Sequence, residues 1–145
     1  MGLIADTSAI VAAYDADDDH HNPVRAILES EPGPIVVPTV ILAEIDYMLR
    51  RFLGIDAELD FLAALENGSF TLEPFTMDDL NRSVALIEKY RSADLGLADA
   101  AVAVIAERLK IRRILTLDVP DFRLMRTQRG EPFVILPADQ PEAAS

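Results

Sequence analysis

Four acidic residues occupy positions where the chain otherwise predicts buried structure. Asp6 and Asp118 each end a short apolar run, LIAD and LTLD, and Asp99 interrupts the apolar stretch LGLADAAVAV. Glu44 lies one helical turn before Met48, at the edge of an apolar stripe. Burying an unpaired carboxylate is costly, so these positions call for a compensating cation or a set of hydrogen bonds.

If the four carboxylates meet, they repel one another. Two unit charges ~4 Å apart repel by ~4 kcal/mol at an effective dielectric constant near 20, and four such groups do not all stay ionised without compensation. No Lys or Arg lies within a few residues of Asp6 or Asp99. Mg²⁺ prefers oxygen ligands, and divalent cations activate water and stabilise the leaving oxygen of a phosphodiester. The four acids therefore point to metal-dependent phosphoryl hydrolysis.

Each acid also has an ordinary structural explanation. Asp6 precedes a predicted helix, and Asp is a favoured N-cap residue. Asp99 can complement the dipole in the first turn of a helix. Asp118 can open a turn before Pro120, and Glu44 can be a surface residue at the rim of its helix. What favours a common site is the joint placement of the four residues.

Strand and helix patterns alternate along the chain, which predicts a mainly parallel sheet covered on both faces. Strands are expected at 2–6, 34–38, 69–75, 112–118 and 133–137, helices at 7–16, 20–30, 39–54, 56–68, 76–90 and 94–110, and a short helix or loop at 119–126. Ligands of such sheets bind at the carboxyl ends of the strands, where Asp6 and Asp118 stand. The predicted fold class is α/β, with three α/β/α layers.

Three local patterns add detail to the predicted helices. Thr39 is a candidate cap for the helix that carries the apolar stripe Ile41, Ile45, Met48 and Phe52. Thr76 and Asp79 have the spacing of a capping box. The segment DLGLADAAVAVIAERLK is apolar nearly all round until Glu107, which predicts a central, buried helix.

Composition limits the class of protein. The chain has 145 residues, half of them hydrophobic, which suits one globular domain. It has no Cys, and this excludes disulfides, thiolate metal sites and a Cys nucleophile. No cleavable leader and no apolar stretch of ~20 residues is present, so we expect a cytoplasmic protein with no membrane partner. The expected domain spans 1–137, followed by a flexible tail at 138–145.

The net charge of −12 argues against a general affinity for nucleic acid, since the footprint of such a protein is basic. An acidic protein can still bind RNA where bound metal ions invert the sign of its site. An acidic surface also favours a basic protein partner. Charge alone leaves these alternatives open.

Four segments resemble, in order, the motifs of PIN-domain ribonucleases, and among these the toxins of bacterial VapBC toxin–antitoxin pairs. The segments are ADTSAIVA, AEIDYMLRR, LGLADAAVAVIAERL and ILTLDVPDFRLM, and the resemblance extends from about Leu3 to Pro137. It implies a PIN-like fold and a metal-dependent endoribonuclease. The implied reaction is in-line hydrolysis of an RNA phosphodiester that leaves a 3′-hydroxyl and a 5′-phosphate.

The resemblance also assigns residues. The positions that match the family's acidic residues, and so are expected to be catalytic and to hold one or two Mg²⁺ or Mn²⁺ ions, are Asp6, Glu44, Asp99 and Asp118. For Glu44, the roles of metal ligand and of proton acceptor both stay open. Asp121 matches an auxiliary acidic position, and Thr7 and Ser8 match hydroxyls that support the first Asp or contact phosphate.

Partners follow from the same resemblance. RNA is the implied substrate, with backbone contacts from Arg123, Arg126 and Arg129, for which solvated surface charge is the alternative. A cognate antitoxin is expected to place a basic C-terminal segment near the acids. The apolar region 40–65 is a candidate both for the antitoxin groove and for a homodimer contact.

Two other functions compete with the ribonuclease. One is a non-catalytic PIN-like protein-binding module, which would keep the fold without needing every acid, yet all four are present. The other is a metal-dependent phosphatase, which also places Asp at strand ends. Against it, ADTS lacks the DxDxT pattern of phosphatases with an aspartate nucleophile.

Overall fold

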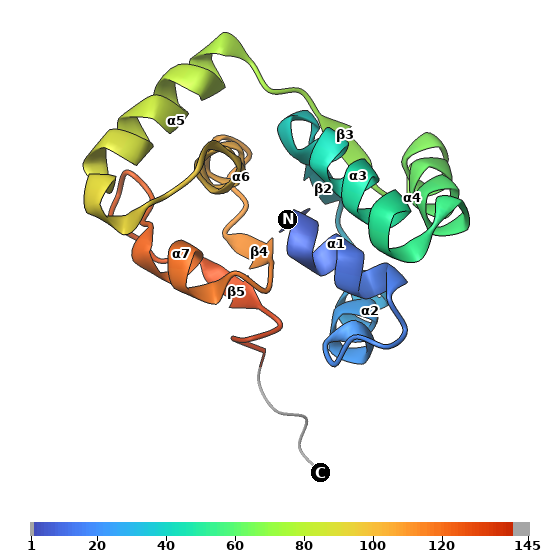
Figure 1. Cartoon of the computed structure of the whole chain (residues 1–145). Coiled ribbons are helices and arrows are strands. Elements are labelled where there is room, and N and C mark those ends of the chain that lie inside the picture. Colours follow the sequence, from blue (N-terminus) through green and yellow to red (C-terminus); the bar gives the residue numbers. More distant parts are fainter. Residues whose placement is uncertain (1, 141–145) are drawn as a thin grey trace.

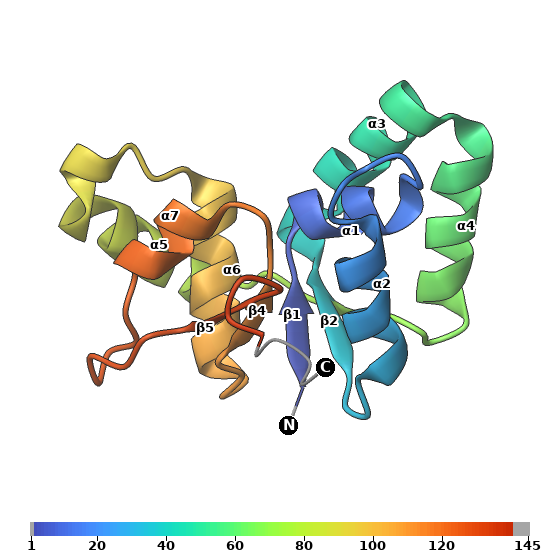
Figure 2. The same cartoon turned by 90° about the horizontal axis from the view of Figure 1, so that it is seen from below.

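The computed structural model describes residues 2–140 and contains a five-stranded sheet in the order β3-β2-β1-β4-β5, with every neighbouring pair parallel. The strands are β1 Leu3–Ala5, β2 Ile35–Pro38, β3 Thr71–Glu73, β4 Arg113–Leu115 and β5 Val134–Leu136. Helices cover both faces of the sheet (Figures 1 and 2). The predicted three-layer α/β/α class with a mainly parallel sheet is confirmed.

The helices form two groups on either side of the sheet (Figure 1). One group contains α1 Thr7–Tyr14, α2 His21–Ser30, α3 Leu42–Leu53 and α4 Ile55–Glu66, and the other contains α5 Met77–Lys89, α6 Leu97–Arg108 and α7 Val119–Leu124. Two short 3-10 turns, η1 Thr39–Ile41 and η2 Arg91–Ala93, precede α3 and α6. The chain therefore brings α1 and α6 to opposite faces of the same central strands.

The core lies along β1 and α6. All of β1 is buried, and α6 is buried continuously from Ala100 to Ala106. Such a helix needs apolar residues all round, because it is enclosed by the sheet on one side and by α5 on the other. The prediction of a central, buried helix in this segment is confirmed.

The predicted stripe on α3 is wrong at its C-terminal end. Ile45 and Leu49 are fully buried, whereas Phe52 is 64% exposed. The buried positions recur every four residues, and this rotates the buried face away from Met48 and Phe52. Thr39 does not cap α3; it begins η1, and its hydroxyl accepts a hydrogen bond from the amide of Phe75 at 3.0 Å.

Several predicted elements are shorter in the structure. Helix α1 ends at Tyr14 and α6 begins at Leu97, two and three residues inside the predicted limits. At the start of α6, Asp94 adopts a left-handed conformation with φ +55° and Gly96 is extended, so the helix cannot begin before Leu97. Each strand is one to four residues shorter than predicted, and 119–124 forms a helix rather than a loop.

The capping box of α5 is confirmed, and it also joins α5 to α6. The side chains of Thr76 and Asp79 each accept a hydrogen bond from the other's backbone amide. Arg108 of α6 donates from Nε and Nη2 to the buried Asp79 carboxylate at 2.9 and 3.0 Å. Burial alone would raise the pKa of Asp79, but the bonds from Arg108 and Thr76 outweigh it and lower the pKa.

The first residues of the predicted tail form a turn. The Asp139 carboxylate accepts hydrogen bonds from Arg123 and from the amide of Ile135, the latter at 2.7 Å. Residues 141–145 of the predicted tail lie outside the described part of the chain, so the boundary at Pro137 stays a prediction. Within residues 2–140, no helix combines the length and apolar character needed to cross a bilayer.

Candidate metal centre

Two of the predicted acids stand at the carboxyl edge of the sheet. Asp6 follows β1 directly, and Asp118 follows β4 after a two-residue step. Strands β1 and β4 are parallel neighbours, with Ile4 opposite Ile114. Their carboxyl ends therefore deliver both side chains to one place, as expected for a parallel sheet.

The third acid of the cluster comes from a helix. Asp99 lies in the first turn of α6. One carboxylate oxygen from each of Asp6, Asp99 and Asp118 lies within 4.8 Å of the other two. Burial decreases across the three, since Asp6 is only 3% exposed, Asp99 is half-buried and Asp118 is exposed. The cluster is thus anchored in the core and open on one side.

Helix capping does not account for Asp6 and Asp118. Asp6 occupies the N-cap position of α1 and Asp118 that of α7, yet neither carboxylate makes a capping hydrogen bond. Asp6 instead accepts a hydrogen bond from the Thr116 hydroxyl through Oδ2 at 2.8 Å. The strongest link of the Asp6 carboxylate is therefore to Thr116, the residue after the neighbouring strand β4, and not to the amides that an N-cap residue satisfies.

Thr116 is a functional candidate that sequence reasoning missed. It is fully buried between β4 and Asp118, and its Oγ1 accepts a hydrogen bond from the amide of Asp118 at 3.0 Å while donating to Asp6. One hydroxyl thus fixes both strand-end acids. The available signal was a Thr in an otherwise apolar strand, two positions before an acid, but its partner is 110 residues away in the sequence.

The hydroxyls beside Asp6 extend this network. Thr116 gives its single proton to Asp6, so Ser8 Oγ donates to Thr116 Oγ1, at 3.3 Å. Ser8 Oγ in turn accepts from the amide of Leu117 at 2.9 Å. Thr7 Oγ1 donates to Glu44 Oε2 at 3.3 Å. Both predicted hydroxyls therefore orient groups of the acidic site.

Burial and mutual repulsion raise the pKa values of the two less exposed acids. Burial raises the pKa of Asp6 to about 7, and the charges of Asp118 and Asp99 add to the effect, although the Thr116 hydroxyl and the Thr7 amide oppose it. Burial also raises the pKa of Asp99 to about 6, together with the charges of Asp121, Asp118 and Glu44. Every neighbouring charge that acts on these two groups is negative.

Glu44 and Asp121 lie near the cluster of Asp6, Asp99 and Asp118 but are not part of it. Both lie outside the group of three oxygens within 4.8 Å, yet both act electrostatically on Asp99. Glu44 is in the first turn of α3, and Asp121 is in the first turn of α7. Within residues 2–140, none of the five acids forms a salt bridge.

The donor set fits a hard divalent cation. It consists of carboxylates, with hydroxyls behind them, and the described residues place no His in the cluster. Oxygen ligands suit Mg²⁺ and Mn²⁺ better than softer metals. A cation would also supply the positive charge that the site otherwise lacks.

The three predicted RNA-contacting arginines have other surroundings. Arg123 is engaged by Asp139, which raises the pKa of Arg123 further. Arg126 donates to the backbone carbonyls of Arg123 and Met125 at 2.6 and 3.1 Å. Arg129 is exposed in the turn before Gly130. The structure thus brings none of the three into the carboxylate cluster.

Comparison with known proteins matches residues 3–125 to the model of the PIN domain family. The chain is 35% identical over 135 residues to Ribonuclease VapC26 of Mycobacterium tuberculosis (strain ATCC 25618 / H37Rv). That alignment covers 93% of this chain and all of the relative. The residues matched to the family model span the positions of all five acids, from Asp6 to Asp121.

Solved structures share the fold at lower identity. VapC20 of Mycobacterium tuberculosis, described as a sarcin-ricin loop cleaving toxin, superposes with a TM-score of 0.75 at 19% identity and covers 82% of this chain and 92% of its own. A toxin–antitoxin complex from Klebsiella pneumoniae gives 0.66 at 21% identity, covering 85% and 92%. VapBC2 of Rickettsia felis, bound to a DNA fragment from its promoter, gives 0.65 at 15%, covering 93% and 97%.

The raised pKa of Asp6 predicts a pH dependence of stability in metal-free protein. Because its folded-state pKa lies above the unfolded value, the folded protein binds more protons between roughly pH 4 and pH 7, and stability falls as pH rises through that window. The loss is at most about 4 kcal/mol, since a tenfold change in proton affinity corresponds to about 1.4 kcal/mol. Asp6→Asn removes this loss and keeps an acceptor for Thr116.

The measurement is urea unfolding in EDTA at pH 5 and pH 7.5. The stability of Asp6→Asn relative to the native protein should increase between the two pH values, while Asp17→Asn, at an exposed position, should show no such increase. Equal differences at both pH values would contradict the account of Asp6.

Thr116 predicts a second result, in metal affinity. Thr116→Val keeps the shape of the side chain and removes the hydrogen bonds to Asp6 and from Asp118, so Mn²⁺ affinity measured by calorimetry should fall by roughly 10- to 100-fold. Thr116→Ser retains the hydroxyl and should stay close to the native affinity. Equal affinities for the Val and Ser variants would show that the hydroxyl does not position the acids.

Proposed function

This chain belongs to the PIN domain family, and on that premise we propose that it is a Mg²⁺- or Mn²⁺-dependent endoribonuclease, the toxin of a toxin–antitoxin pair. The observation that carries the proposal is the convergence of Asp6, Asp99 and Asp118 without a neighbouring positive charge among residues 2–140. The sequence identity of 35% with Ribonuclease VapC26, over 93% of this chain, supports RNA as the substrate.

In this proposal Asp6, Asp99 and Asp118 hold one or two divalent ions, and Asp121 assists from α7. A bound cation would supply Lewis-acid stabilisation of the phosphoryl oxygens and a lower pKa for the attacking water. Among the three ligands, the Asp6 side chain has the least freedom to move, because it is buried and hydrogen-bonded to Thr116. Asp118, exposed and held only through its backbone amide, faces the side from which RNA enters.

Glu44 fits the role of proton acceptor better than that of a metal ligand. It is exposed at the start of α3, lies outside the tight cluster and is close enough to Asp99 to act on its pKa. The hydrogen bond from Thr7 orients one of its oxygens and leaves the other free to accept a proton from water. In the proposed reaction the water oxygen forms a bond to phosphorus and gives its proton to Glu44, the P–O bond to the leaving 3′-oxygen breaks, and that oxygen takes up a proton from solvent.

The apolar surface between α3 and α4 supports an antitoxin partner. Four large hydrophobic side chains there are at least half exposed, namely Tyr47, Phe52, Ile55 and Leu59. Exposed apolar patches of this kind are typical of protein interfaces. We propose that an antitoxin's C-terminal segment covers this surface and places a basic residue among the acids, and that region 40–65 also contributes to a homodimer.

We propose a cytoplasmic location, because cellular RNA is the proposed substrate. The toxin–antitoxin complex from Klebsiella pneumoniae, which shares the fold, supports the idea of a protein partner. A purely protein-binding function would not need three carboxylates held together against their repulsion. The acid cluster therefore favours the enzyme over the binding module.

The test is cleavage of total cellular RNA by purified, antitoxin-free protein with Mg²⁺, with Mn²⁺ or with EDTA. Discrete fragments should form with either metal and not with EDTA. Asp6→Asn and Asp99→Asn should each slow cleavage by at least roughly 100-fold, because several kcal/mol of transition-state stabilisation depend on the cation. Asp17→Asn, an exposed acid outside the site, should cleave like the native protein.

Two results would contradict the proposal. A folded, metal-loaded protein that leaves RNA intact would favour the protein-binding module. Cleavage that persists equally in both Asn variants would place the activity elsewhere.

A further inference from the structure

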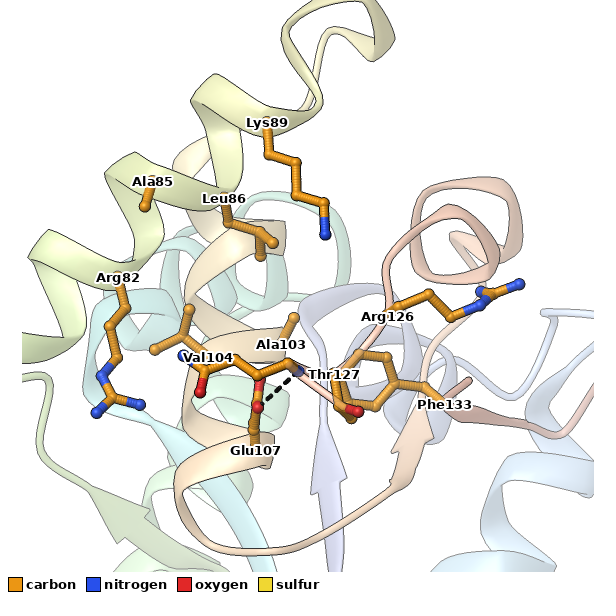
Figure 3. A pocket seen from close by; sticks show the side chains of 11 residues that line it. Arg82, Ala85, Leu86, Lys89, Ala103, Val104, Glu107, Arg126, Thr127 and Phe133 are labelled. Carbon is orange, nitrogen blue, oxygen red and sulfur yellow. Dashed lines mark hydrogen bonds between the residues drawn. The ribbon is translucent and has the colours of Figure 1, made fainter. Parts of the chain in front are cut away.

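Two cavities adjoin each other beside the C-terminal half of α6. The first, of about 200 Å³, lies between α5, α6 and the segment 126–133, and the second, of about 370 Å³, lies between residues 107–112 and the segment 127–131; Glu107, Thr127 and Gln128 line both. Figure 3 shows the first cavity, with Arg82 and Lys89 extending from α5 and Arg126 on the opposite wall. We call these two cavities together the α6 groove.

The α6 groove concentrates positive charge in an acidic protein. Six basic residues line it: Arg82, Lys89 and Arg126 at the first cavity, and Lys110, Arg112 and Arg129 at the second. The chain has 13 Lys and Arg against 25 Asp and Glu, and its only two lysines are both in this set. A concentration of this kind indicates an anionic ligand.

Four of the six cations lack a carboxylate partner among residues 2–140. The exceptions are Arg82, which pairs with Asp78, and Arg112, which pairs with Glu131, each at 3.0 Å. The four are Lys89, Lys110, Arg126 and Arg129. Glu107, the acid shared by both cavities, accepts a hydrogen bond from the amide of Gln128 at 2.8 Å (Figure 3). Positive charge therefore remains available to a ligand.

A closed turn presents two of these cations. Arg126 forms a β-bridge with Pro132, and inside the turn the Thr127 amide donates to the Glu131 carbonyl at 3.0 Å. Gly130, with φ +80°, supplies the left-handed residue that the turn requires. Because these bonds fix the backbone around Arg129, a ligand need not order the turn on binding.

The first cavity lies on the same face of α6 as Asp99. Asp99, Ala103 and Glu107 follow one another at intervals of four residues within α6, so they share one face, and Lys110 lies in the turn that follows the helix. Ala103 and Glu107 line the first cavity, and Glu107 and Lys110 line the second. At 1.5 Å per residue, Glu107 lies about 12 Å along the axis from Asp99.

We infer that the α6 groove is a binding track for single-stranded RNA, in which the strand that enters the metal centre continues along α6 with its phosphates on Lys89, Lys110, Arg126 and Arg129. This inference rests on the proposed ribonuclease function. The floor of the first cavity is apolar, with Leu86, Val104 and Phe133, and apolar surface beside cations suits a nucleobase next to its phosphate. Phosphate contacts raise affinity and do not select sequence.

The test measures RNA binding without cleavage. A fluorescent oligouridine long enough to span the groove and the metal centre is titrated with full-length protein in EDTA at several salt concentrations. Under these conditions the acidic centre repels RNA, so binding reports on the groove. The double variant Lys89→Gln/Lys110→Gln removes one charge from each cavity, and neither lysine side chain makes a hydrogen bond within residues 2–140.

The matched control is Arg25→Glu, which changes the net charge by the same two units at one exposed position of α2, on the other side of the sheet. The groove variant should bind roughly tenfold more weakly at low salt, about threefold for each phosphate contact. Its slope of log affinity against log salt should become shallower by about 1.4, or about 0.7 for each contact. The control should retain the native slope.

The other outcomes separate this inference from the proposed function. Suppose that the native protein cleaves total RNA, but the groove variant keeps the native affinity for oligouridine and the native salt slope. This result would overturn the RNA track and leave the proposed ribonuclease function standing. A groove variant that binds oligouridine normally but loses binding to poly-glutamate would identify an acidic polypeptide as the ligand, and would also overturn it. A native protein that neither binds oligouridine nor cleaves total RNA would overturn both.

Discussion

The hydrogen bond from Thr116 to Asp6 is the interaction on which the acidic site depends. Three carboxylates within 4.8 Å repel one another, and burial raises the pKa of Asp6 to about 7. Thr116 opposes both the repulsion and the rise in pKa. Its hydroxyl donates a hydrogen bond to the Asp6 carboxylate and accepts one from the backbone amide of Asp118. This one side chain therefore fixes the spacing of two acids whose charges would otherwise separate them.

The hydrogen bond between Thr116 and Asp6 can form because β1 lies beside β4 in the sheet. The parallel pairing of Ile4 with Ile114 brings the two strand ends to one edge, and the buried helix α6 adds Asp99 from its first turn. The same helix then leads away from the cluster toward the basic side of the molecule. The protein thus separates its acidic cluster from a positive surface, and this arrangement would reconcile a net charge of −12 with the anionic substrate that we propose.

Sequence patterns predict the fold class well because strand–helix alternation and apolar periodicity are local properties. Asp6 and Asp118 can be recognised because each ends an apolar run of the sequence, and parallel strands end at a common edge. Thr116 was missed because its role depends on a partner 110 residues away, which no local pattern reveals. Helical periodicity predicts Phe52 in the core, yet an apolar stripe leaves the rotation of its helix uncertain by one position. Packing of α3 against α1 and α4 decides which of its residues are buried. The α6 groove was hidden for a similar reason, since its cations come from separate elements.

The most direct test of the metal centre is a crystal structure of the protein grown with Mn²⁺, with diffraction data collected at the manganese absorption edge. Our account predicts an anomalous peak bounded by the carboxylates of Asp6, Asp99 and Asp118, with the Thr116 hydroxyl still donating to Asp6. A folded protein that shows these three carboxylates in place and no anomalous peak between them would contradict it.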